Sequence, residues 1–132
     1  MQVGFLSSNS SFMMEKSMDF LWAKQAAILD NIANAETPNY KAKVVTFEEN
    51  LRQQLEAAQV GSQSATRRQI RQALEKSDYQ VQEQQEVTRM DDNGVNVTEQ
   101  STEMLRNSYQ LQYVMGAINS DLSRLRTAIR GQ

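Results

Sequence analysis

The side chains that could carry out acid–base or metal chemistry are few, and their spacing does not favour it. Adjacent carboxylates occur at Glu48-Glu49 and Asp91-Asp92, but neighbours in an extended segment point to opposite faces. DDNGVNVTE, residues 91–99, has some features of a calcium loop but lacks the ligand spacing and the glutamate at the twelfth position. The chain has no histidine and no cysteine, which removes the commonest general base and the thiolate ligand. We therefore expect no catalytic residue, no cofactor and no metal site.

The most distinctive polar stretch is NIANAETPNY, which begins at Asn31. Asn31 and Asn34 are three residues apart and share one face of a helix. Their amides can donate to the last carbonyls of that helix or to the backbone of another chain. Pro38, the only proline, pushes Thr37 out of the helical region, and Tyr40 offers an apolar ring with a polar tip. Two interpretations stay open: a helix stop followed by a turn, and a junction with another subunit.

Composition favours protein partners over nucleic acid or lipid. The chain has 14 basic and 16 acidic residues, so we expect no nucleic-acid partner and a solvated face around Arg67, Arg68 and Arg71. Only 39% of its 132 residues are apolar, so we expect one domain with a thin core that partners complete. No run of about 18 apolar residues occurs, and the first residues lack a basic and then apolar leader, so we expect no membrane span and no cleaved signal peptide.

The segment that precedes Pro38 has the apolar spacing of an amphipathic helix. Over residues 12–35, apolar side chains alternate at spacings of three and four, with Gln25 as the one interruption. We expect this helix to end near Ala35 or Glu36. The members of its stripe that we assign to an interface are Met14, Met18, Leu21, Ile28 and Ile32.

The last third of the chain repeats this spacing. It predicts a helix of roughly 45 Å over residues 98–132, capped by Asn96 or Thr98, with Ser108 filling a gap in the stripe. The stripe residues that we assign to an interface are Leu111, Met115, Ile118, Leu122, Leu125 and Ile129.

The middle of the chain predicts shorter elements. Residues 40–45 alternate and should be extended, and Thr46 to Glu49 has the spacing of a capping box for a short second helix that ends by Gly61. Residues 62–86 are polar and rich in glutamine, with room for one short helix. Residues 87–97, VTRMDDNGVNV, predict a hairpin around Asn93-Gly94.

The predicted fold is mainly α, with long N- and C-terminal helices packed as a coiled-coil-like pair. An extended segment and a small β-hairpin lie between them. Within the single domain we distinguish an N-terminal helical segment (1–36), a central region (37–97, with the hairpin near 87–97) and a C-terminal helix (98–132). The two stripes either form a simple helical hairpin or also face neighbouring copies.

Asn31-Ile32-Ala33-Asn34, followed after two residues by Thr37-Pro38-x-Tyr40, resembles the N-terminal signature of bacterial flagellar rod and hook proteins. Most members have glycine after the proline, where this chain has Asn39. The stretches TPNYKA, MDDNGVNV and LRTAIRG (125–131), together with the chain length, are similar to one branch, the proximal basal-body rod proteins.

The resemblance implies a structural subunit without enzyme activity. Such subunits are exported by the flagellar type III apparatus without a cleaved leader, and they polymerise into the periplasmic rod of the basal body with their terminal helices as an inner layer. The implied partners are copies of the chain, other rod subunits, the rod-to-ring adaptor, and proteins of the membrane ring and export gate. The motif from Asn31 to Tyr40 would seat one subunit against the next. The alternative is a helical binding module or export chaperone that forms a discrete coiled-coil complex.

Overall fold

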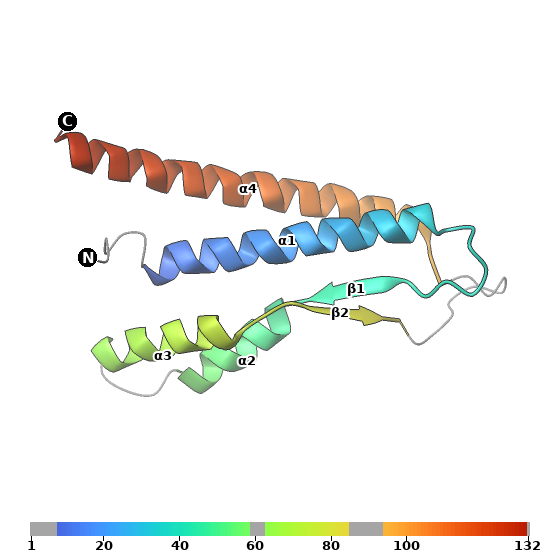
Figure 1. The fold of residues 1–132 in the computed structure, drawn as a ribbon, viewed down its shortest axis with the longest axis horizontal. Coiled ribbons are helices and arrows are strands. Elements are labelled where there is room, and N and C mark those ends of the chain that lie inside the picture. The colour runs from blue at the N-terminus through green and yellow to red at the C-terminus, as the bar shows by residue number, and fades with distance from the viewer. Residues whose placement is uncertain (1–7, 59–62, 85–93, 132) are drawn as a thin grey trace.

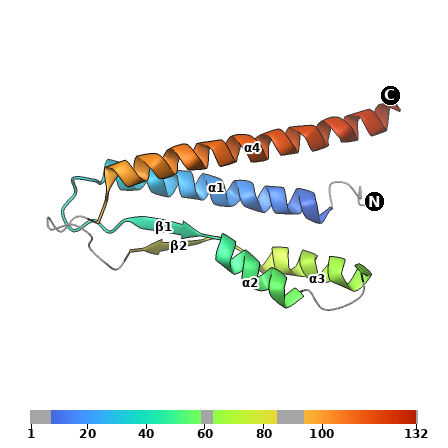
Figure 2. The ribbon, with the colours of Figure 1, turned by 180° about the vertical axis from the view of Figure 1, so that it is seen from behind.

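The computed structural model describes residues 8–58, 63–84 and 94–131. Within them, α1 lies between α4 and a layer that contains the two strands and the two shorter helices (Figure 1). Seen from behind, the same layers appear, and in both views α1 and α4 diverge with distance from the strands (Figure 2). The elements are α1 (Asn9–Ala33), β1 (Lys43–Thr46), α2 (Glu48–Ala58), α3 (Gln63–Lys76), β2 (Gln80–Glu83) and α4 (Val97–Arg130).

The long terminal helices confirm the predicted fold class. α1 begins after Ser8, whose side chain accepts from the Ser11 N–H, and it ends at Ala33, slightly before the expected Ala35 or Glu36. α1 buries residues on two sides, one toward α4 and one toward the lower layer, because it is the central element. Its buried residues are Phe20, Leu21, Ala27, Ile28 and Asn31.

α4 has a defined start and end. The Asn96 side chain accepts from the N–H groups of Thr98 and Glu99, which confirms one of the two predicted N-caps. At the other end Gly131 has φ 68°, and its N–H donates to the Thr127 carbonyl. Glycine adopts this left-handed conformation without a Cβ penalty, so the helix stops there.

The small antiparallel sheet is present, but its strands differ from those expected. β1 pairs with β2 in the register Lys43↔Glu83 to Thr46↔Gln80, so the extended run after Pro38 is confirmed. The expected first strand, 87–90, lies outside the described residues. The expected second strand, 95–97, was wrong: residues 94–96 have no regular structure and Val97 opens α4. The reason is that Asn96 caps a helix while Gly94 is hydrogen-bonded to Tyr40.

α2 and α3 pack beside each other under the first half of α1. α3 is longer than the short helix expected in the polar segment, because Ala73 and Leu74 reach the core. The two residues of the predicted capping box of α2 have other roles. Thr46 belongs to β1, and the Glu49 carboxylate accepts hydrogen bonds from the side chains of Arg52 and Gln53.

The core lies where the middle of α1 meets the β1–α2 junction, α3 and the first half of α4. The rings of Phe20 and Phe47 stack with centroids 5.3 Å apart. Among the described residues, Phe12 and Met13 near the start of α1 pack against this cluster as partly buried side chains, whereas the second half of α4 contributes only Val114 to it. Its buried members are Phe20, Leu21, Ala27, Val45, Phe47, Leu51, Leu74 and Leu111.

Candidate functional site

The candidate site is the turn between α1 and β1, which we call the asparagine corner and define as residues 31–43. Asn31 is fully buried there (0% exposed). Its Oδ1 accepts from the Lys43 N–H at 2.7 Å, and its Nδ2 donates to the Lys43 carbonyl at 2.8 Å. The side-chain amide therefore pairs with β1 as a neighbouring peptide group would.

The same amide also reaches α4 and the tyrosine of the motif. Asn31 Nδ2 donates to Gln100 Oε1 at 3.0 Å, and the Tyr40 hydroxyl donates to Asn31 Oδ1 at 3.3 Å. One buried side chain thus joins the end of α1, the start of β1 and the first turn of α4. Within the chain, Asn31 is a structural tie between three elements.

Asn34 and Thr37 stop the helix. The backbone N–H and the Nδ2 of Asn34 both donate to the Asp30 carbonyl, at 3.0 and 2.8 Å, which satisfies an end carbonyl of α1. Thr37 Oγ1 donates to Asn34 Oδ1 at 3.1 Å. Pro38 and Asn39 follow at the exposed tip of the turn. The helix-stop interpretation therefore accounts for the contacts of Asn34.

Asn39 stands where the resembling family most often has glycine. Its φ is 60°, in the left-handed region that asparagine enters more readily than other non-glycine residues. The corner retains its turn without the glycine.

A lysine and a tyrosine set the electrostatics of the corner. Lys43 Nζ lies 2.9 Å from Asp30 Oδ2, and this hydrogen bond raises the pKa of Lys43. Partial burial raises the pKa of Tyr40, and the charge of Lys43 opposes that rise. Both groups keep their protonated forms at neutral pH, so Tyr40 can donate to Asn31.

Two residues that pattern reasoning missed close the corner from the other side. The Gly94 N–H donates to the Tyr40 carbonyl at 3.2 Å, and a Cβ on Gly94 would come within 3.1 Å of that oxygen. Val95 beside it is fully buried. Gly94 was expected to form a hairpin turn; it instead permits close approach of two backbones.

α1 and α4 are joined by polar contacts as well as apolar ones. Asn107, also fully buried, donates from Nδ2 to the Leu21 carbonyl at 3.0 Å and to Gln25 Oε1 at 2.8 Å. Lys24 and Glu103 form a half-buried ion pair at 3.2 Å. Gln25, which interrupted the stripe in the sequence, therefore has a partner across the helix pair.

The structure brings only part of the predicted stripes together. Leu21, Ile28 and Leu111 are buried, and a second group of stripe residues is half-buried: Met14, Met18, Ile32, Ile118 and Leu125. Three stripe residues of α4 are exposed instead, Met115, Leu122 and Ile129. The side of α4 that faces α1 follows residues 107, 111, 114 and 118. Asn107 and Val114 therefore lie on that side, and Met115 does not.

Comparison with known proteins places the chain in a family. It is 36% identical over 117 residues to the flagellar basal body rod protein FlgB of Aeromonas hydrophila, over 83% of this chain and 85% of the relative. The chain belongs to the FlgB family of flagellar basal body rod proteins. It is also 29% identical over 119 residues to FlgB of Bacillus subtilis (strain 168), over 89% of this chain and 91% of the relative. No family model matches.

This FlgB-family chain exposes large apolar side chains on both terminal helices. Leu105, Tyr109 and Tyr113 follow one another at four-residue spacing on α4, and Tyr113 is 80% exposed. On α1, Trp22 and Leu29 lie seven residues apart and are at least half exposed. Large apolar groups repeated along one helix face are typical of surfaces that contact other proteins.

The described part of the chain offers little else. No three acidic side chains within it gather where they would hold a metal ion. None of its helices has both the length and the apolar character of a membrane span. The features that remain for a function are the asparagine corner, the outer faces of α1 and α4, and the groove between these two helices.

Proposed function

We propose that this chain is a structural subunit of the proximal flagellar rod, which polymerises through its terminal helices and links the membrane ring and export gate to the rest of the rod. FlgB relatives are named as flagellar basal body rod proteins. The observation that carries the proposal is that α1 and α4 pack on each other and still expose Trp22, Leu29, Leu105, Tyr109 and Tyr113. Neighbouring subunits would cover these side chains.

The partners follow from the same proposal. They are copies of the chain, other rod subunits, the rod-to-ring adaptor and the proteins of the ring and export gate, in the basal body and after export by the type III apparatus. The role is structural, without catalysis or cofactor. A small core with many exposed helical residues suits a chain that must unfold for export and finish its burial on assembly.

The asparagine corner would serve assembly in two ways. Asn31 is buried, so its contribution is to fix how β1 meets the helix pair. Thr37 and Pro38 are exposed at the tip of the turn, so they would contact the next subunit. The predicted interface at Asn31, Asn34, Thr37, Pro38 and Tyr40 is thus divided between a supporting part and a contacting part.

One experiment addresses the role directly. A labelled copy of the chain should be found at the proximal end of the rod in electron micrographs of purified basal bodies, and deletion of the gene should abolish rods and motility. The alternative, a helical binding module or export chaperone, predicts a discrete dimer or heterodimer by light scattering and no label in the basal body. That pair of results would reject the proposal.

The corner gives a second test. Pro38→Gly should impair rod assembly while lowering the melting temperature by only a few degrees, because Pro38 is exposed. Asn31→Ala should lower both. If Pro38→Gly lowered assembly only as far as it lowered stability, the corner would be a local fold element with no contact of its own.

A further inference from the structure

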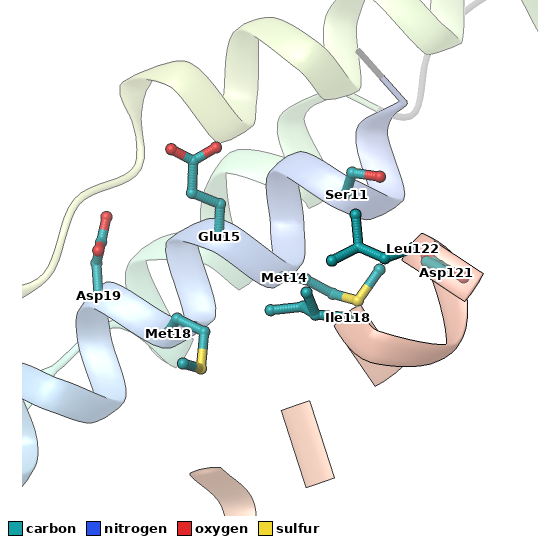
Figure 3. Close-up of a pocket in the computed structure, with 8 residues that line it drawn as sticks. All are labelled: Ser11, Met14, Glu15, Met18, Asp19, Ile118, Asp121 and Leu122. Atoms are coloured by element: carbon teal, nitrogen blue, oxygen red, sulfur yellow. The ribbon is translucent and has the colours of Figure 1, made fainter. Parts of the chain in front are cut away.

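A groove between the terminal helices has no described segment in it. It has a volume of about 320 Å³ and lies between the first half of α1 and the second half of α4. Apolar side chains form its floor, and three acidic residues stand around it: Glu15, Asp19 and Asp121. Figure 3 shows the apolar side chains from the two helices converging, Met14 against Ile118 and Leu122.

The register of the helix pair explains why the groove is open. Contacts between Asn31 and Gln100 and between Gln25 and Asn107 place the start of α1 level with about Leu122. The helices also diverge toward that end (Figure 1). The last two turns of α4 therefore project beyond the described start of α1.

The projecting end of α4 has the chemistry that the groove lacks. Arg126 and Ile129 are three residues apart and so lie along one face, with Arg130 adjacent. Ile129 is 75% exposed. Among the described residues, Arg126 and Arg130 have no acidic partner, whereas Arg124 pairs with Asp121 at 3.7 Å. This end offers an exposed isoleucine flanked by two guanidinium groups.

We propose that the groove receives the projecting end of α4 from a second copy of the chain. Ile129 would enter between Met18 and Leu122, and Arg126 and Arg130 would face Glu15 and Asp19. Charge complementarity between an acidic rim and a basic end fixes the orientation and selects the partner. The inference rests on the proposed function and names the contact through which copies meet.

The contact joins two different surfaces, so it need not stop at a pair. The copy that donates its α4 end keeps its own groove free, and the copy that accepts keeps its own end free. Contacts of this head-to-tail kind generate open helical series when the rotation does not close. This is the geometry required of a rod subunit that adds copies one after another.

The absence of cysteine in the sequence permits a direct test. A Met18→Cys chain and an Ile129→Cys chain, with tags of different size, are expressed together in the source bacterium, and purified basal bodies are oxidised. A disulfide forms only where the two Cα atoms lie within about 7 Å. We expect the mixed disulfide between the two chains to be the main product.

A matched control uses Tyr113→Cys, which is more exposed than Ile129 but lies on another face of α4. Its mixed product with Met18→Cys should be at least about tenfold lower. Equal yields, or a Met18→Cys product with a different protein or with a cysteine placed within residues 1–7, would overturn the proposal. Recovery of both chains in the basal body would still leave the rod role intact, so the two failures are distinguishable.

Charge reversal provides the second measurement. Asp19→Arg in the Met18→Cys chain, or Arg130→Glu in the Ile129→Cys chain, should reduce the mixed disulfide several-fold. Expressing the two changed chains together should restore it, because the opposite charges then meet again between copies. Arg68→Glu, on the exposed surface of α3, should have no effect. A loss in the doubly changed pair equal to the sum of the single losses would contradict a direct Asp19–Arg130 contact.

Discussion

Replacing Asn31 by alanine tests whether one buried amide ties α1, β1 and α4 together. The amide makes four hydrogen bonds, three of them at 3.0 Å or less. Alanine removes all four and leaves the N–H and carbonyl of Lys43 and the amide oxygen of Gln100 without this partner. The loss falls on three elements at once, so the effect should exceed that of an ordinary surface substitution.

The expected magnitude follows from burial. An unsatisfied buried polar group costs about 1–3 kcal/mol, but Lys43 and Gln100 are only half-buried, so water would partly replace Asn31. We expect Asn31→Ala to lower the free energy of unfolding by about 2–4 kcal/mol. With an unfolding entropy near ~2.1 cal/mol/K per residue, 3 kcal/mol corresponds to a fall of about 10 °C in the melting temperature of this chain.

Urea unfolding followed by circular dichroism measures the change, and amide exchange at β1 locates it. Asn34→Ala is the matched control, because Asn34 makes an exposed helix-end contact worth only about 1 kcal/mol. Asn31→Asp should be at least as harmful as alanine, since a carboxylate cannot donate to Lys43 or Gln100. If Asn31→Ala cost no more than Asn34→Ala, the amide would not be the tie described above.

Three further predictions concern the corner and the helix pair. Raising the pH above about 10 should destabilise the corner. The folded pKa values of Tyr40 and Lys43 lie above their ordinary values of 10.0 and 10.5. Their contribution to the free energy of unfolding is therefore full below those ordinary values and is lost as the pH rises through the folded pKa. Melts from pH 9 to 12 with and without Tyr40→Phe would show a smaller loss in the variant. Gly94→Ala should cost about 1–2 kcal/mol by crowding a backbone oxygen, measured by urea unfolding. Asn107→Asp should lower the urea midpoint more than Asn107→Ala does, because a buried carboxylate cannot donate to the neighbouring carbonyl and amide oxygen of α1.

The long helices were predictable because their signals are local. Apolar spacing, the cap at Asn96 and the break before Pro38 each depend on a few neighbouring residues. The partner of β1 was not predictable in this way: Gln80–Glu83 is exposed along its whole length and has no alternating pattern, and its pairing closes a loop of more than thirty residues. Gly94 was assigned to a hairpin, but among the described residues its N–H donates to the Tyr40 carbonyl and the residues after it cap and open α4.

The stripe of α4 shows a second limit of pattern reasoning. Assigning every apolar residue at spacings of three and four to one face included Met115, which is exposed. Leu122 and Ile129 are exposed for another reason: α1 and α4 diverge there, and the last turns of α4 run past the start of α1. The true face contains Asn107, whose amide is buried by pairing with α1. A polar residue at a buried position carries no signal of its partner in the sequence, and the same is true of Asn31.

Polar ties and apolar surface are unevenly distributed along the helix pair, and this bears on how a subunit could join others. The hydrogen bonds of Asn31 and Asn107 and the Lys24–Glu103 pair all lie in the half near the strands. Directional bonds of this kind fix register, so that half is held to one arrangement. Toward Asn9 and Arg130 the contact is made by flexible methionines and exposed aliphatic side chains, which adapt to a partner. A chain built with one fixed end and one adaptable end can keep its own shape while, in the proposed contact, the open end would be completed by the next copy.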